Sequence, residues 1–213
     1  MMKNYFVIIG DIVSSRQIED RAHVQTKFSA AIETLKRNNK KMFLSPPTLT
    51  IGDEFQAVLK STTNLFLRIH QFEAEMSPVQ LRFGLGLGKI DTPINTKAAI
   101  GMDGSAFHNA RRAIETARNE KRKYVLFSSI EQEQSLAWQL ILRWIDLTLQ
   151  GWSMEKQQIL ILNRMGKRQK EIASLLHITQ PAVSQHINKK NFSLIVQSEE
   201  FLENRFNKIL TGD

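Results

Sequence analysis

Two carboxylates in the N-terminal half have the residue type and the surroundings that suit a divalent cation. Asp11 lies in the segment VIIGDIV, and Asp53 lies in TIGDEF. Each follows a short apolar run, so we expect them at the ends of neighbouring strands. Two carboxylates held together there could share cations that bind a triphosphate. The alternative is that each acid only caps a strand end or a turn, as aspartates often do.

A second group of residues, near the C-terminus, suits contact with double-stranded DNA. The segment QKEIASLLHITQPAVSQHIN spans residues 169–188 and predicts two short helices that cross. Ala173 is the small residue that such a crossing needs, and Thr179 is a favourable N-cap for the second helix. Glutamine side chains can pair with adenine edges, and basic side chains suit phosphates. The predicted DNA-contacting residues are Arg168, Thr179, Gln180, Ala182, Ser184, Gln185, Lys189 and Lys190.

The positive charge of the chain is concentrated in two places. The 213 residues carry a formal net charge of +8. One basic cluster lies between Arg164 and Lys190, and another lies between Arg111 and Lys123. Basic clusters attract the phosphates of nucleic acids or of nucleotides. Taken alone, each cluster could equally be a solvated face.

The composition excludes several classes of protein. The chain has no cysteine, which excludes disulfides, thiolate zinc sites and cysteine nucleophiles. Its five histidines are scattered and show no metal-ligand spacing. No segment approaches the roughly 18 consecutive apolar residues of a membrane span, and the N-terminal apolar run is too short for a signal peptide. We therefore expect a cytoplasmic protein with no membrane partner.

The elements that must position these residues predict an α+β fold. Apolar alternation and turn residues indicate a β-α-β-β-α-β order, followed by a further helix and strand. This is the split βαβ, ferredoxin-like arrangement, which we expect as an antiparallel sheet with its helices on one face. Gly52-Asp53 is the expected hairpin turn, and Ser61 is the expected N-cap of the next helix. The predicted strands are 5–9, 49–51, 55–59, 79–87 and 124–127, and the predicted helices are 17–36, 61–76 and 105–118.

A further helix is predicted over residues 130–150, and it is rich in apolar side chains. It is too hydrophobic for a solvated linker, so we expect Trp138 and Trp144 to be buried between domains or subunits. The predicted organisation is an α+β domain over residues 1–128, an apolar connecting helix over 129–151, and an all-α helix-turn-helix domain over 152–213.

Four segments of the N-terminal half resemble the catalytic domain of class III nucleotidyl cyclases, which is related in fold to diguanylate cyclases and polymerase palms. They are GDIVSSR, LTIGDEF, RFGLGLG and GSAFHNARRAIETAR, in the order of that family. The resemblance implies that Asp11 and Asp53 bind Mg²⁺ or Mn²⁺ with a nucleotide. It also implies that Arg112 stabilises charge on the transferring phosphate. His108 stands where the family has its transition-state asparagine, with Asn109 adjacent.

The base-recognition residues of those families are not kept. Leu49 stands at the position of the lysine that recognises adenine, and Gly101 stands at that of its acidic partner. Ile51 replaces the first glycine of the diguanylate cyclase hairpin. The resemblance therefore retains the metal pair and loses the known means of base recognition.

The C-terminal segment resembles the helix-turn-helix of LuxR-type regulators and of sigma-factor-like region 4 domains. His177 stands where such motifs usually have glycine, and histidine is one of the less unfavourable residues for a left-handed turn. The alternative to a DNA-binding pair is an ordinary helical hairpin with an apolar seam. In its length, motifs and appended helix-turn-helix, the whole chain resembles the SatD family of bacterial proteins.

These observations favour a DNA-binding, transcriptional regulator with a degenerate cyclase-like domain that binds a nucleotide or a divalent metal. Class III cyclase sites form between two subunits, and helix-turn-helix proteins read paired half-sites, so both halves favour a homodimer on double-stranded DNA. The alternative function is an active nucleotidyl cyclase, or a related nucleotidyltransferase, that uses two metals at Asp11 and Asp53. A third possibility is a nucleic-acid-associated scaffold that uses neither site.

Overall fold

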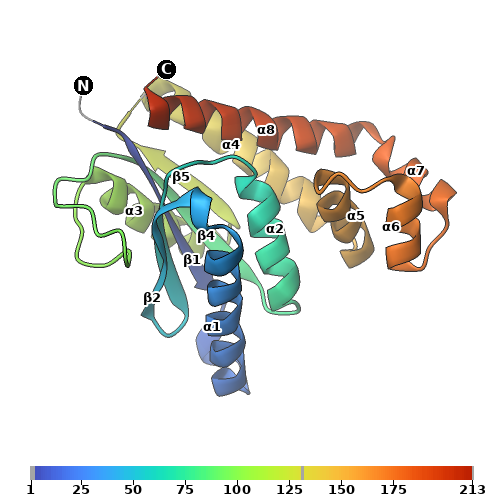
Figure 1. The fold of residues 1–213 in the computed structure, drawn as a ribbon, viewed down its shortest axis with the longest axis horizontal. Helices are drawn as coiled ribbons and strands as arrows, with labels where there is room; N and C mark the ends of the chain where they lie inside the picture. The colour runs from blue at the N-terminus through green and yellow to red at the C-terminus, as the bar shows by residue number, and fades with distance from the viewer. Residues whose placement is uncertain (1–2, 131, 213) are drawn as a thin grey trace.

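The computed structural model describes residues 3–130 and 132–212, which form a five-stranded sheet and the helices around it (Figure 1). The first four strands pair antiparallel in the order β2-β3-β1-β4, which confirms the predicted ferredoxin-like arrangement. The fifth strand, β5, pairs parallel with β4 at the edge. The strands are β1 (Tyr5–Ile12), β2 (Phe43–Ile51), β3 (Glu54–Leu59), β4 (Leu81–Gly88) and β5 (Tyr124–Ser128).

Helices cover both faces of the sheet, so the expectation of helices on one face is wrong. Phe6 and Val7 are neighbours in β1, and both are fully buried. Because successive side chains of a strand point to opposite faces, each of the two faces needs its own cover. Phe6 belongs to the larger core, and Val7 belongs to a separate one with α3. The larger core includes α1 (Arg21–Asn38) and α2 (Leu65–Met76), and the other face is covered by α3 (Ser105–Asn119).

The glycines of β4 let α3 approach the sheet closely. A Cβ atom on Gly86 would lie 2.2 Å from the carbonyl oxygen of Ala106, and one on Gly84 would lie 2.5 Å from the backbone nitrogen of Ile114. A side chain at either position would push the helix away. The glycine–leucine alternation of RFGLGLG therefore sets how near the arginines of α3 come to the end of β1.

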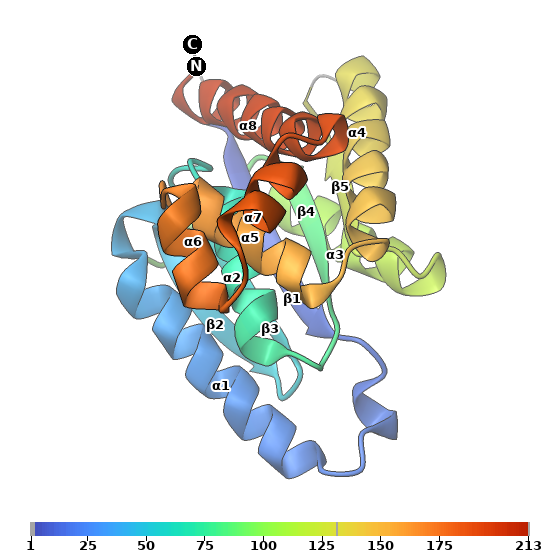
Figure 2. The ribbon, with the colours of Figure 1, turned by 90° about the vertical axis from the view of Figure 1, so that its right-hand side faces the viewer.

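The C-terminal helices share the larger core with the sheet. Helix α8 runs from the end of the molecule that holds α5–α7 back across the sheet to the N-terminus (Figures 1 and 2). The ring of Phe206 in α8 lies 5.1 Å from that of Phe6 and 5.5 Å from that of Trp138. The segment predicted as a helix-turn-helix domain thus contributes core residues to the α+β segment. These helices are α4 (Gln132–Gln150), α5 (Met154–Arg164), α6 (Gln169–Leu176), α7 (Gln180–Ile187) and α8 (Lys190–Thr211).

Two helices begin later in the chain than predicted. Helix α1 begins at Arg21, where the side chain of Asp20 caps it. Helix α2 begins at Leu65 instead of near Ser61, and its first turn is capped from outside. The carboxylate of Glu203, in α8, accepts from the backbone N–H of Asn64 at 3.1 Å and from that of Phe66 at 2.9 Å. A carboxylate at a helix N-terminus satisfies free N–H groups and the helix dipole together.

Helix α4 buries one of its faces and exposes the other. Trp138 is 2% exposed and packs inside the chain, whereas Trp144 is half-buried. Leu136, Leu140 and Leu147 are 64%, 63% and 53% exposed. No helix of the described chain has the length and the hydropathy needed to cross a membrane.

Candidate functional site

The end of β1 carries a buried carboxylate held by two arginines. Asp11 is 4% exposed and lies opposite Arg82 of β4 in the sheet register. The Oδ2 atom of Asp11 lies 3.4 Å from Nε of Arg82. It also accepts a hydrogen bond from Nη2 of Arg118 at 3.1 Å. Arg118 belongs to the last turn of α3, which the glycines of β4 allow to lie against this face of the sheet.

Asp53 lies beside Asp11, in the turn between β2 and β3. Its backbone carbonyl accepts from the N–H of Ile12 at 3.1 Å, and its Oδ2 atom accepts from the hydroxyl of Ser15. Burial raises the pKa of Asp11, the arginines oppose this, and the nearby charge of Asp53 raises that pKa further. The pKa of Asp11 is raised overall. The structure therefore brings the two predicted carboxylates together at one end of the sheet.

Glu54 adds a third carboxylate that our sequence analysis did not single out. It is 4% exposed, and it accepts from Nη1 and Nη2 of Arg111 at 2.6 and 2.8 Å. Thr50 donates its hydroxyl to the same carboxylate at 2.9 Å. The signal in the sequence that could have identified Glu54 is its position directly after Asp53 in GDEF. Because both carboxylate oxygens of Glu54 accept hydrogen bonds within the chain, Glu54 holds α3 against the sheet.

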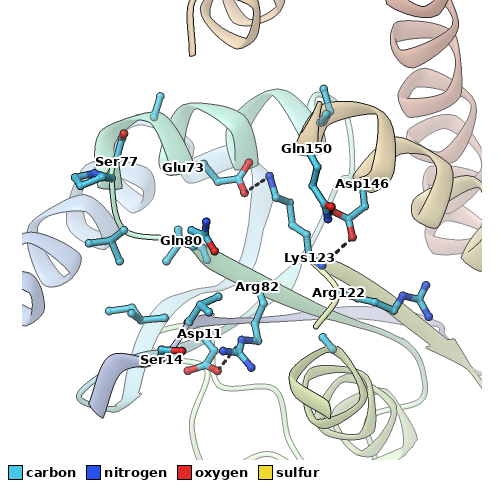
Figure 3. Close-up of a pocket in the computed structure, with 18 of the residues that line it drawn as sticks. Asp11, Ser14, Glu73, Ser77, Gln80, Arg82, Arg122, Lys123, Asp146 and Gln150 are labelled. Atoms are coloured by element: carbon cyan, nitrogen blue, oxygen red, sulfur yellow. Dashed lines mark hydrogen bonds and ion pairs between the residues drawn. The ribbon is translucent and has the colours of Figure 1, made fainter. Parts of the chain in front are cut away.

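Asp11, Asp53 and Glu54 line a cleft of about 1250 Å³ (Figure 3). Its walls include the end of β1, the start of β4, the C-terminal ends of α2, α3 and α4, and one side of α5. Lys123 spans the cleft wall, because its Nζ lies 2.9 Å from Glu73 and its backbone N–H donates to Asp146 at 3.0 Å. The basic residues that line the cleft are Arg16, Arg82, Arg118, Lys121, Arg122 and Lys123.

Arg112 and His108, predicted as catalytic, do not line this cleft. The guanidinium carbon of Arg112 lies 4.1 Å from the centre of the Phe127 ring. Nε2 of His108 lies 2.7 Å from the carboxylate of Asp103, and both side chains are exposed. Neighbouring positions of a helix point about 100° apart, so α3 cannot present Arg112 in the direction of Arg111. Within one chain, the arginines that meet the acidic residues are therefore Arg111 and Arg118.

The predicted DNA-contacting residues lie on the outer side of the C-terminal helices. Helices α6 and α7 are joined by a turn in which His177 has φ 54° and ψ 38°, the left-handed conformation expected for this position. The side chain of Thr179 caps α7 by accepting from the N–H of Ala182 at 3.4 Å. We call the following exposed residues the α7 surface: Arg168, Thr179, Gln180, Ala182, Gln185, Lys189 and Lys190, with Ser184 half-buried among them.

The comparison with protein families gives a match over nearly the whole chain. The sequence profile of the SatD family matches residues 5–201. This chain belongs to the SatD family. The matched region includes the sheet, the cleft and the helices of the α7 surface. The comparison with curated proteins gives no match.

Solved structures that are similar to part of this SatD-family chain include three cyclases. A bacterial light-regulated adenylyl cyclase is 14% identical with a TM-score of 0.44, over 64% of this chain and 81% of that one. The non-canonical dimeric guanylyl cyclase domain of the RhoGC fusion protein from the aquatic fungus Blastocladiella emersonii is 16% identical with a TM-score of 0.40, over 54% and 74%. The catalytic core of a rhodopsin-guanylyl cyclase with converted specificity, in complex with ATPαS, is 16% identical with a TM-score of 0.38, over 54% and 73%.

The cleft of this SatD-family chain does not suit a divalent cation in the arrangement observed. Residues 3–130 and 132–212 contain no group of three or more histidine, aspartate or glutamate side chains that could hold a metal. The Oδ2 atom of Asp11 already faces two guanidinium groups, and that of Asp53 accepts from Ser15. A cation at Asp11 would be repelled by both arginines at short range. The Mg²⁺ or Mn²⁺ implied by the cyclase resemblance therefore does not fit these residues as they lie.

A buried ionic network, which no sequence pattern revealed, joins α2, α5 and α8. Arg164 pairs with Glu199 and, at 3.1 Å, with Glu203. Nε2 of His70 lies 2.7 Å from Oε1 of Glu199. Burial by itself lowers the pKa of His70, but the carboxylates of Glu199 and Glu73 outweigh it and raise this pKa to about 9. We call Arg164, His70, Glu199 and Glu203 the junction network.

Proposed function

We propose that this SatD-family protein is a transcriptional regulator that binds double-stranded DNA through α7. The observation that carries the proposal is the division of α7 into two sides. Val183 and His186 are buried on the inner side, whereas Gln180, Ala182 and Gln185 are exposed on the outer side. A recognition helix needs such an outer side, because its N-terminal residues reach base edges in the major groove.

Basic residues at the ends of the helix pair support contacts with phosphates. Lys189 and Lys190 lie where the chain passes from α7 into α8, and both are exposed. Among the described residues, no ion pair joins either lysine to a carboxylate. Solvated lysines of this kind can neutralise DNA phosphates and release counterions.

We propose further that the regulator acts as a homodimer. Leu136, Leu140 and Leu147 expose more than half of their surface along one side of α4. Large apolar side chains gathered on one exposed side of a helix are typical of protein interfaces. A two-fold dimer would present two α7 helices to half-sites about 34 Å apart, one turn of DNA.

Selection of duplexes from a random library by the intact protein tests the proposal. We expect enrichment of a two-fold symmetric sequence, and a dimer in sedimentation velocity at micromolar concentration. Lys189→Ala with Lys190→Ala should weaken binding to every duplex. The matched control is Lys40→Ala with Lys41→Ala, an exposed lysine pair far from α7 in the chain, which should bind as the wild type does. Failure to bind or enrich any duplex at low salt would overturn the proposal.

A second candidate is a nucleotidyl cyclase or a related nucleotidyltransferase. The observation that favours it is the meeting of Asp11 and Asp53, the pair that the cyclase resemblance assigns to Mg²⁺ or Mn²⁺ and a nucleotide. The arginines on Asp11 count against it. Arg112 and His108 lie outside the cleft of their own chain, so a cyclase site would need them from a second subunit.

Product analysis after incubation with each nucleoside triphosphate and Mn²⁺ or Mg²⁺ tests this second candidate. A cyclic or oligomeric product that disappears in Asp53→Asn would support it. Mn²⁺ should then also raise the melting temperature of the wild type, but not that of Asp53→Asn, by mass action on the folded state. Neither a product nor an ion-dependent shift is expected if the cleft has another ligand.

A further inference from the structure

We propose that the cleft binds the phosphate groups of a small molecule directly on Arg82 and Arg118, without a divalent cation. The proposal starts from the disagreement between the cyclase resemblance and the observed site. Where the resemblance implies cations between two carboxylates, one carboxylate oxygen of Asp11 is shared by two guanidinium groups. The proposed phosphate site does not depend on DNA binding by α7, because the cleft and the α7 surface have no residue in common.

Arg82 is a buried cation that lacks a full set of partners. Its side chain is 9% exposed, and it reaches from β4 toward Asp11 inside the cleft (Figure 3). Its Nε atom is buried and has no hydrogen-bond partner in the described chain. This Nε atom lies 3.4 Å from Oδ2 of Asp11, with which Arg82 forms an ion pair. Buried guanidinium donors normally have acceptors, so the unsatisfied Nε atom of Arg82 indicates an acceptor that comes from outside the chain.

The charges around Arg82 favour an anion as that acceptor. Arg82 and Arg118 carry two positive charges, and both lie against a single carboxylate oxygen. Arg16 and Lys121 add exposed positive charge to the same cleft, and no ion pair joins them to other described residues. An anion beside the two arginines would be attracted by both guanidinium groups and repelled by the carboxylates of Asp11 and Asp53, whereas a cation would meet both guanidinium groups at short range.

The geometry favours a phosphate group carried by a small molecule. Guanidinium groups match phosphate oxygens with two parallel hydrogen bonds, and two such groups suit a doubly charged phosphate. The side chain of Arg118 is 54% exposed, so one of the two arginines is open to solvent. Because Arg82 lies deep in a concave cleft, the phosphate backbone of a duplex cannot reach it.

Titration calorimetry of the intact protein with EDTA present tests the proposal at constant ionic strength. The probes are inorganic pyrophosphate and ATP, with succinate as an anion that lacks phosphate. We expect pyrophosphate or ATP to bind and succinate not to bind. Arg82→Gln should weaken binding by about 10- to 100-fold, the effect of losing charged hydrogen bonds. Arg37→Gln, an exposed arginine of α1, is the matched control and should leave binding unchanged.

The Asp11→Asn substitution distinguishes a site that binds phosphate on arginines from a site that binds a metal, because it should change the phosphate affinity in opposite directions in the two cases. It removes the carboxylate that competes for both guanidinium groups, so phosphate binding in EDTA should tighten by about 10-fold or more. A metal site would instead lose its ligand and its affinity. Circular dichroism and thermal melting confirm that each variant is folded.

The outcomes are distinct. If pyrophosphate binds and ATP does not, the ligand is an inorganic anion. If ATP binds, the ligand is a nucleotide. Either result supports the proposed site. Absence of binding in EDTA, restoration of binding by Mn²⁺ alone, or loss of binding in Asp11→Asn would overturn the proposal. These results are independent of duplex binding by the wild type, so failure here leaves the proposed regulator standing.

Discussion

The junction network and the α7 surface are both charged, but their charges have opposite surroundings. The side chain of Arg164 is 4% exposed, and those of its partners Glu199 and Glu203 are 0% and 6% exposed. Lys189 and Lys190 are exposed, and no carboxylate of the described chain forms an ion pair with them. A buried charge loses its hydration and needs a partner, whereas a solvated charge remains free for an external phosphate. The difference indicates that the first set holds α2, α5 and α8 together, and it leaves the second set free for the proposed contact with DNA.

Removal of Arg164 should produce the largest effect. Arg164→Gln leaves Glu199 and Glu203 buried without their cation, so the free energy of unfolding should fall by about 3–5 kcal/mol. Urea denaturation at pH 7 measures this change. Lys189→Gln, the control from the α7 surface, should change the same quantity by less than about 0.5 kcal/mol. Similar small changes in both variants would break the comparison.

The pH dependence of stability should report on the same network through His70. Its pKa is about 9 in the folded state, above the ordinary value of 6.5, so the folded state binds the proton more tightly. This stabilisation is fully present below pH 6.5 and is lost as the pH rises through 9, with a fall of about 3 kcal/mol in the free energy of unfolding. His70→Gln should abolish that part of the pH dependence.

The control for His70 is His23→Gln, on the exposed side of α1. It should keep the fall in stability between pH 6.5 and 9 seen in the wild type. Chemical denaturation across this range gives both curves. An unchanged curve in His70→Gln would show that the buried pair with Glu199 does not hold α2 to α8 as argued.

On the α7 surface, substitution should affect binding without affecting stability. Gln185→Ala removes a side chain placed to reach base edges, so it should cost roughly 1–3 kcal/mol of binding free energy at the selected duplex. Binding to a random duplex should stay the same, and so should the urea midpoint. Fluorescence anisotropy with the two duplexes measures the difference. Equal losses on both duplexes would contradict base readout by Gln185.

The smallest effect is expected from a single phosphate contact. Lys189→Ala should weaken binding to all duplexes alike and reduce the slope of log K against log salt by about 0.9, the value for one phosphate. Anisotropy titrations at several salt concentrations give this slope. A slope equal to that of the wild type would place Lys189 away from the DNA and would remove the distinction between the two charged regions.

Local patterns in the sequence were enough to predict the fold class. The order of strands and helices along the chain, the hairpin turn at Gly52-Asp53 and the α3 helix follow from side-chain alternation, turn residues and helical periodicity. The left-handed conformation of His177 was also expected, because the helix-turn-helix motifs that this segment resembles usually have glycine at that position. Each of these features depends on residues within a few positions of one another, which is why the sequence reveals them.

Partnerships between distant segments were decided only by the tertiary structure. The cyclase resemblance pointed to Arg112, but the packing of α3 on the glycines of β4 turns Arg111 and Arg118 toward the acidic residues. Likewise, α2 begins where Glu203 of α8 caps it. Which charge meets which carboxylate depends on how helices rotate and pack, and buried charges select the partners that restore their lost hydration. No spacing within the sequence encodes that choice.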